Sequence, residues 1–350
     1  MTTAAHPAPT GLLRGPAFDL IFIAGLAGVA ITTGLVVTAR PELFWPILVL
    51  DLWLLGYHHV IATYTRLAFD RESFREHRAL VLYLPLAVMA GVTAIALSAG
   101  LWLLVSVYLY WQWFHYTRQS EGISKAYAGR ARDSDTGNPR LARLAFYAVP
   151  IAGILNVSAR APERFLFMPI KTIPVPDWLA FAAVIAAAGL CGLWLAEQIR
   201  ILARGRLAPA YFGYMVSHFA IFSVAYIGLS EINYGWLAVN LWHNAQYILF
   251  VWLFNNRRFN GKVDPQRILL STISQDRRFP LYIAACLTLS TVVYTLMEGL
   301  GVDALGNALG VSTAVATVII YQTLNFHHYV VDSLIWKLRR PALRSKLGLT

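Results

Sequence analysis

The chain has 350 residues, of which 57% are hydrophobic and only 13% carry a charge. A soluble domain carries roughly 25% charged residues. This composition, with apolar runs recurring from Phe18 to Trp336, excludes a soluble globular protein and predicts a polytopic membrane protein. The net charge of +11 does not indicate a nucleic-acid partner, because the chain has no soluble basic domain that could bind one.

We predict an all-α bundle of about ten transmembrane helices. A helix that crosses the bilayer needs roughly 20 apolar residues, and the fifth predicted span is short by this measure. The cysteines Cys191 and Cys286 lie inside apolar runs and indicate neither a disulfide framework nor a zinc site. In chain order the predicted spans are 18–38, 44–65, 79–98, 101–118, 144–158, 178–199, 209–229, 233–254, 279–298 and 311–336.

The basic residues predict the direction of these spans. With the N-terminus in the cytoplasm, 25 of the 29 Lys and Arg residues fall in inner segments. Because cytoplasmic loops are rich in Lys and Arg, this bias predicts an even number of spans, with both termini cytoplasmic, in a bacterial-type inner membrane. We therefore expect a cytoplasmic tail at 1–17, a membrane bundle at 18–338 and a basic cytoplasmic tail at 339–350.

The outer connections differ in length. Tight turns are predicted at Ala99-Gly100, at 230–233 and at 299–310. The segment 159–177 is longer and contains four prolines, which interrupt helices because they lack the backbone N–H. We expect this segment to form a lid or to lie at the membrane interface.

Histidine occurs in four predicted spans that all run from outside to inside, at depths within roughly 12 Å of one another. Imidazole is costly to bury in hydrocarbon unless it is paired, hydrogen-bonded or bound to a metal. The convergence therefore predicts a metal site inside the bundle, and a further histidine on the seventh span lies at a similar depth. The candidate metal ligands are His58, His59, His115, His218, His243, His327 and His328.

Each histidine also has a simpler interpretation. A lone membrane histidine such as His218 more often makes a hydrogen bond between helices than it binds a metal, and His115 could face the membrane interface. Adjacent residues on a helix point about 100° apart, so only one member of each His-His pair can aim at a given ion. The other member could bind a second metal or support a ligand.

Polar neighbours could orient these imidazoles or join them as ligands. Asp332 follows His328 by four residues and Asp51 precedes His58 by seven, so each carboxyl shares a helix face with a histidine. Metal-bound histidines usually donate their second N–H to such groups. Imidazole with an occasional carboxylate suits iron, copper, zinc or manganese. The flanking aromatic residues either line a tunnel for an apolar substrate or form an interfacial belt.

Four histidine motifs carry a family resemblance, namely His58-His59, Phe114-His115-Tyr116, residues 242–250 and residues 326–332. At these motifs the chain resembles the Brp/Blh family of membrane β-carotene 15,15′-dioxygenases, whose histidines are widely spaced in transmembrane helices. Two departures stand out. Tyr247 stands where the third family motif often has a second histidine, and Thr117-Arg118-Gln119 replaces a glycine and an aspartate in the second.

The resemblance implies a membrane-embedded non-haem iron oxygenase, which would use Fe(II) and O2 to cleave a double bond of a lipophilic substrate and give retinal from β-carotene. Asp332 would orient a ligand, and Tyr247 would stand at the catalytic centre. Arg118 and Gln119 indicate a polar group on the substrate or a different reaction. The need for an electron donor is open. The expected iron ligands are His59, His115, His243 and His328, with His58, His218 and His327 as alternates.

Two other classes of function fit the same histidines. A haem-binding electron carrier needs two axial histidines on facing helices, although six are more than one haem uses. A transporter, or a proton or metal relay, also places histidines and aspartates inside the membrane. Transporters often break their helices near the midplane, whereas the prolines here lie near the ends of the predicted spans.

Overall fold

The computed structural model describes residues 11–69, 71–131, 134–259 and 261–337. This part of the chain is almost entirely helical, which confirms the predicted all-α class. The predicted tail at 339–350, and most of that at 1–17, lie outside the described residues. The first helices are α1 (Pro16–Leu20), α2 (Leu26–Ala39), α3 (Phe44–Asp51), α4 (Tyr57–Leu67), α5 (Arg71–Glu76), α6 (Arg78–Leu82) and α7 (Leu84–Ser98).

The rest of the chain follows the same pattern. The middle elements are α8 (Leu101–Arg130), α9 (Pro139–Ala159), strands β1 (Arg164–Phe165) and β2 (Met168–Pro169), α10 (Asp177–Ala203), α11 (Pro209–Ser223) and α12 (Ile232–Phe259). The last helices are α13 (Ile268–Ile273), α14 (Phe279–Leu296), α15 (Val302–Leu309) and α16 (Thr313–Ile335).

Short π-helical and 3₁₀ segments join several of these helices into longer rods. The π-helical turns are η1 (Ile21–Gly25), η3 (Leu52–Gly56), η4 (Val224–Gly228) and η7 (Met297–Gly301). The 3₁₀ turns are η2 (Pro41–Leu43), η5 (Pro265–Arg267) and η6 (Asp276–Arg278).

Seven helical segments of the described chain are long and apolar enough to cross a membrane, so the chain is an integral membrane protein. The helices α8, α12 and α16 have 30, 28 and 23 residues but are not among the seven. These three helices carry more polar residues, and three of the four histidine motifs lie in them. The seven segments are Pro16–Ala39, Pro41–Leu67, Arg78–Ser98, Pro139–Ala159, Asp177–Ala203, Pro209–Gly228 and Asp276–Leu309.

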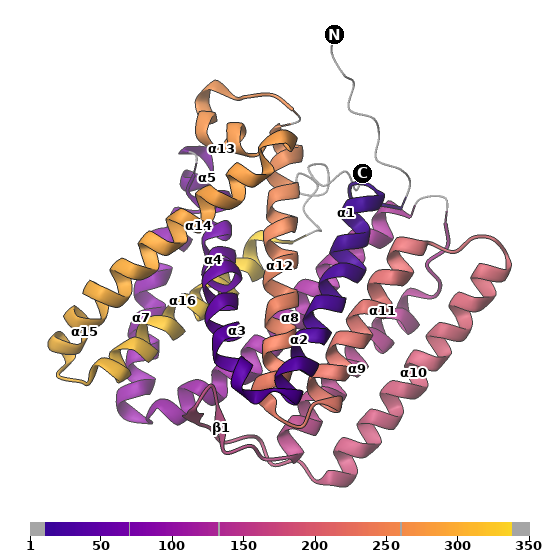
Figure 1. Ribbon diagram of the computed structural model, residues 1–350, viewed down its shortest axis with the longest axis horizontal. Helices are drawn as coiled ribbons and strands as arrows, with labels where there is room; N and C mark the ends of the chain where they lie inside the picture. The colour runs from indigo at the N-terminus through magenta and orange to yellow at the C-terminus, as the bar shows by residue number, and fades with distance from the viewer. Residues whose placement is uncertain (1–10, 70, 132–133, 260, 338–350) are drawn as a thin grey trace.

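Helix α12 forms the centre of the bundle. Most of its side chains are buried, and it packs against α2, α4, α8 and α11. At Gly235 a Cβ atom would lie 1.9 Å from the carbonyl oxygen of Ala225 in η4, so this close approach requires glycine. Figure 1 shows α12 near the middle of the molecule, with α10 at one edge and α14 and α15 at the opposite edge.

Helices α7, α10 and α14 lie at the periphery. In the most apolar windows of the three spans that contain them, only 11%, 17% and 22% of residues are buried. Large apolar side chains such as Leu193 on α10 and Val292 on α14 are exposed. An apolar surface of this extent is typical of a membrane protein, where lipid chains cover it.

The histidine-bearing helices α4, α8, α12 and α16 run in the same direction. Contacts between their C-terminal ends show this. Arg66, near the end of α4, donates to a backbone carbonyl at the end of α16 and lies 4.5 Å from the ring of Phe254 on α12. Arg130, at the end of α8, donates to the backbone shortly before Arg14, which lies over Trp252 of α12.

The proline-rich segment covers the opposite end of this group. Strands β1 and β2 form an antiparallel hairpin. The hairpin buries Phe165 completely, with ring centroids 6.1 Å from Tyr108 and 5.7 Å from Trp236. The Leu166 N–H donates to Asn233 Oδ1 at 2.7 Å. The segment therefore closes the N-terminal ends of α8 and α12.

Two predicted boundaries are wrong. The predicted turn at 299–310 is helical as far as Leu309, and the chain turns only at Gly310, where φ is +65°. Helix α15 continues because it packs on α16 and buries Val302. Helix α8 does not end at 118 but extends to Arg130, about 45 Å in all. Its extra turns build the wall of a cavity.

Candidate metal centre

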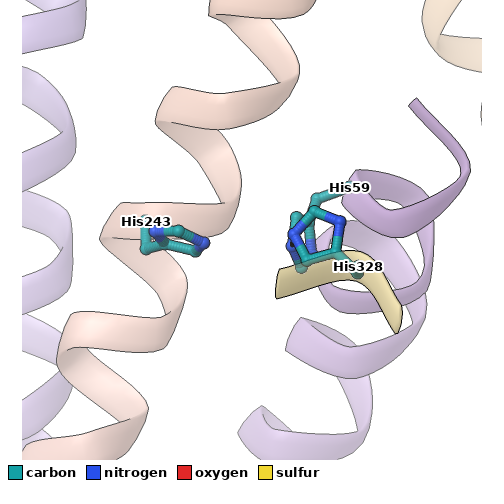
Figure 2. A group of neighbouring side chains, drawn as sticks. All are labelled: His59, His243 and His328. Carbon is teal, nitrogen blue, oxygen red and sulfur yellow. Dashed lines mark hydrogen bonds between the residues drawn. The ribbon is translucent and has the colours of Figure 1, made fainter. Parts of the chain in front are cut away.

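Four histidines from four helices meet inside the bundle. They are all buried, and Figure 2 shows His243 facing His59 and His328 across the space between α12 and the other two helices. Their rings form a closed circuit with short centroid distances. These distances are 4.5 Å for His59–His328, 5.1 Å for His328–His115, 5.0 Å for His115–His243 and 5.4 Å for His243–His59.

The ring of His59 is oriented by the backbone. Its Nδ1 lies 2.9 Å from the carbonyl oxygen of Gly56, which can only accept, so Nδ1 carries the hydrogen and Nε2 keeps a lone pair. Gly56 ends the π-helical turn η3, and such turns often occur at functional sites. The free Nε2 faces Nε2 of His328 at 2.9 Å.

A run of buried contacts leads from His328 to Asp332. Nδ1 of His328 lies 3.1 Å from Thr63 Oγ1, and Thr63 Oγ1 lies 2.9 Å from the phenolic oxygen of Tyr247. The Tyr247 hydroxyl donates to Asp332 Oδ1 at 2.7 Å. With the contact between His59 and His328, this run has four contacts. Only three hydrogens are available for them, one each from the neutral imidazole of His328, the Thr63 hydroxyl and the Tyr247 hydroxyl. With Asp332 ionised, the network is one hydrogen short, and a cation at the two Nε2 atoms would remove the deficit.

Three further polar atoms at the centre lack partners. Within the described part of the chain, His115 Nε2, His243 Nε2 and Asp332 Oδ2 are buried and make no hydrogen bond. Asp332 Oδ2 lies 3.4 Å from His328 Nε2 and 4.0 Å from His115 Nε2. Each unsatisfied buried polar atom costs about 1–3 kcal/mol. Together they need a partner that these side chains do not supply.

The residues fit a metal ion by both chemistry and spacing. Two groups of three residues could each hold an ion, because within each group the donor atoms lie within 4.8 Å of one another. His328 belongs to both groups. Two atoms that each bind one ion at about 2.1 Å lie at most about 4.2 Å apart, so small side-chain movements complete either group. Imidazoles with one carboxylate suit iron, copper, zinc or manganese. The groups are His59, His243 and His328, and His115, His328 and Asp332.

Tyr247 connects the centre to the C-terminal end of α16. Its phenolic oxygen accepts a hydrogen bond from Trp336 Nε1 at 3.1 Å and contacts Thr63. Sequence reasoning selected Tyr247 but missed Thr63 and Trp336. Each lies four residues after a central residue, Thr63 after His59 and Trp336 after Asp332. The helical spacing could therefore have found both.

The structure keeps the other three candidate histidines apart from the centre. His218 uses both ring nitrogens, one with a serine of α8 and one with the carbonyl oxygen of Phe146 at 3.0 Å, and stacks on that phenylalanine. His327 donates to the carbonyl oxygen of Leu80 at 2.7 Å. His58 is buried, but among the described residues it belongs to neither potential metal group. One member of each His-His pair therefore faces the centre.

Asp51 acts on the centre through other residues. Its Oδ2 accepts from Asn240 Nδ2 at 2.6 Å, and Asn240 Oδ1 accepts from the hydroxyl of Tyr116. The ring of Tyr116 lies 4.2 Å from that of His243 and also contacts Gln112 through its hydroxyl. Asp51 thus supports the packing of His243, and it contributes no atom to either potential metal group of the described chain.

A cavity of about 690 Å³ adjoins the centre, within the size range of small-molecule sites. Arg118 and Gln119 line it. Arg118 pairs with Glu121 and donates to the Tyr147 hydroxyl at 2.7 Å. The lining joins three residues of the centre to aromatic and charged side chains. It includes His115, Tyr247, Asp332, Trp111, Phe114, Phe250, Tyr329, Trp336, Arg118, Gln119, Glu121, Gly122, Lys125 and Lys337.

No family model, no curated protein and no solved structure matches this chain. The Brp/Blh resemblance therefore stays a prediction that rests on the four histidine motifs. Two polar residues of the motif at 326–332, His328 and Asp332, lie at the centre, and Tyr247 of the third motif reaches them from α12.

Proposed function

We propose that this protein is a membrane-embedded non-haem iron oxygenase of the kind that the Brp/Blh resemblance implies. It would act with O2 on a lipophilic substrate, with carotenoid cleavage to retinal as the reaction of the family it resembles. The iron would be held by His59, His115, His243 and His328, with Asp332 as a further donor or as the group that orients His328.

One observation carries the proposal: buried nitrogen and oxygen atoms from four helices converge with fewer hydrogens than they need. Nε2 of His59 and Nε2 of His328 are 2.9 Å apart, and Nε2 of His115 and His243 have no hydrogen-bond partner within the described chain. With Asp332 ionised, the protein groups leave the contacts between His59 and Asp332 one hydrogen short. A bound transition-metal ion would remove this deficit and give the unpartnered atoms a partner.

The residues of the chain divide the remaining work. Bound iron would supply the activation of O2. Gly56 and Thr63 hold the rings of His59 and His328, which fixes the nitrogen atoms that face the ion. The Tyr247 hydroxyl holds Asp332. The cavity beside His115 would hold the substrate, and its aromatic wall would exclude water from the reacting bond.

The topology belongs to the same proposal. We infer that α8, α12 and α16 cross the bilayer with the seven apolar segments, which gives ten spans with both termini in the cytoplasm of a bacterial-type cell. The Arg-rich C-terminal ends of the histidine helices support this orientation. An unidentified electron donor would then reach the protein from the cytoplasm.

The geometry favours a bare ion over haem. Haem ligation places the porphyrin between two axial imidazoles, and Nε2 atoms 2.9 Å apart leave no room for it. A proton relay is the second candidate, favoured by the buried chain from Asp51 through Asn240 to Tyr116. Proton uptake by proteoliposomes that is lost in Asp51→Asn would support the relay.

Metal analysis of the purified protein tests the oxygenase proposal. We expect stoichiometric iron in the parent protein and a loss of affinity of more than about 100-fold in His328→Ala and His115→Ala, because each removes a ligand. His218→Ala is the matched control, since it also removes a buried imidazole from the bundle but from outside the centre. Protein that holds no metal, or equal metal in all three variants, would overturn the proposal.

A further inference from the structure

The cavity beside the centre changes in character along one face of α8. The lining residues of this helix follow one another at helical spacing, so they form a single stripe. Trp111 and Phe114 lie at one end, next to His115. Arg118 follows His115 by one turn, and Lys125 lies about 15 Å further along the axis than His115. The cavity is therefore apolar beside the centre and cationic at its other end.

The cationic end carries an excess of positive charge. Glu121 is the one carboxylate among the described residues that line this end, and it is 5% exposed. Arg118 pairs with it, and Lys125 Nζ lies 2.8 Å from its Oε1. Lys337 also lines the cavity. At this end two cations thus face a single carboxylate, and such a surface attracts anions.

Two further features indicate a ligand at this end. The Oε1 atom of Gln119 is buried and makes no hydrogen bond within the described chain. Because an amide oxygen only accepts, Gln119 pairs with a carboxylate once its amide turns to present the NH2 group. Gly122 lies within the second half of α8, although glycine is unfavourable inside a helix. A Cβ atom at Gly122 would meet nothing within 4 Å, so the absence of a side chain keeps the cavity open.

We propose that this cavity binds a single-chain lipophile with a carboxylate head group. The head group pairs with Arg118 and Lys125, and the chain extends past His115 to Phe114 and Trp111. The inference rests on the proposed function, because this ligand would be the substrate of the oxygenase. The head group would then determine which bond of the chain lies at the metal centre.

The experiment compares palmitate with hexadecanol, which has the same chain but no charge. Binding is measured by isothermal titration in nanodiscs of phosphatidylcholine, with the protein as purified and under anaerobic conditions so that no turnover contributes. We expect palmitate to bind more tightly than hexadecanol. The double substitution Arg118→Gln/Lys125→Gln should weaken palmitate binding by about tenfold or more and leave hexadecanol unchanged.

A second variant blocks the cavity itself. Gly122→Phe should abolish binding of both ligands, because its ring fills the cavity, whereas Gly122→Ala should retain both. Thermal unfolding of the two variants checks that the fold is intact. If Gly122→Phe unfolds, the double substitution on the exposed side chains of Arg118 and Lys125 still decides the question.

The inference would be overturned by equal affinity for the two ligands, by unchanged palmitate binding in the double variant, or by displacement of palmitate by phosphatidylglycerol added to the nanodiscs. The last would identify a bilayer lipid as the occupant. Iron without palmitate binding would reject this inference and leave the metal centre standing. Palmitate binding without metal would keep the site and reject the oxygenase.

Discussion

Helices α12 and α10 have almost the same length, 28 and 27 residues, but opposite surroundings. Most side chains of α12 are buried, including the polar Asn240, His243 and Gln246. Helix α10 packs on α9 with one narrow stripe, and most of its other residues are exposed. Its buried residues are Ala180, Ala187, Trp194, Gln198 and Ile201, all at spacings of three, four or seven.

The difference separates what lipid requires from what protein permits. A helix that faces lipid must be apolar, because hydrocarbon cannot satisfy a polar side chain. A helix surrounded by other helices can carry amides and imidazoles, because its neighbours supply partners such as Phe22, whose carbonyl oxygen accepts from Gln246 at 3.1 Å. Apolarity along the chain therefore marks the outside of this bundle, and polarity marks its centre.

Alanine substitution of one glycine in each helix tests this comparison with the largest expected effect on stability. In Gly235→Ala on α12, the new Cβ would lie 1.9 Å from the backbone oxygen of Ala225, which cannot move without displacing η4. We expect a loss of about 3 kcal/mol or more, or failure to fold. In Gly189→Ala on α10, nothing lies within 4 Å of the Cβ, and stability should rise by about 0.5–1 kcal/mol.

Thermal unfolding in detergent, followed by size-exclusion chromatography, measures both variants. Because the same atoms are added in each, the difference between them reports only the surroundings of the two helices. A similar effect in both would mean that α12 is no more tightly packed than α10.

Alanine substitution of one leucine in each helix tests the same comparison with a smaller expected effect on stability. Leu237 on α12 is completely buried, whereas Leu193 on α10 is 62% exposed. Leu237→Ala should lower the free energy of unfolding by about 2–3 kcal/mol because it leaves a cavity among α12 and its neighbours. Leu193→Ala should change it by less than about 0.5 kcal/mol. The midpoints of unfolding in a denaturing detergent series give both values, and equal midpoints would contradict the assignment of α10 to the lipid-facing surface.

Much of this arrangement follows from the sequence, because hydropathy and charge report on the outside of the protein. The all-α class and the shared direction of the histidine helices were both predictable. The continuation of the helix over 299–309 was not, because glycines at 299, 301 and 306 favour a turn locally, whereas packing of α15 on α16 is a tertiary contact.

The expected ligands His59, His115, His243 and His328 do meet in the structure, but spacing alone does not explain which member of each His-His pair faces the centre. Spacing alone leaves His58 and His59 equivalent, and likewise His327 and His328. The choice depends on the rotation of α4 and α16 about their axes, which packing sets. His218 was expected to make hydrogen bonds between helices more often than to bind a metal, but its particular partners, Ser120 and a backbone carbonyl, come from two other helices and could not be predicted.

The smallest expected effect concerns two buried tyrosines, one at the centre and one outside it. Tyr247 donates to Asp332, whereas Tyr214 contacts Ser120 and Gln246. Tyr247→Phe removes the hydroxyl that holds Asp332 and leaves the carboxylate with one partner fewer. Metal affinity should therefore fall by about tenfold, as for other groups that orient a ligand. Tyr214→Phe, which deletes an equally buried hydroxyl, should leave metal affinity unchanged. It should lower the free energy of unfolding about as much as Tyr247→Phe does. Competition with a chromogenic chelator measures the affinities. Equal affinities in the two variants would show that the hydroxyl of Tyr247 supports the packing of the bundle rather than the metal centre.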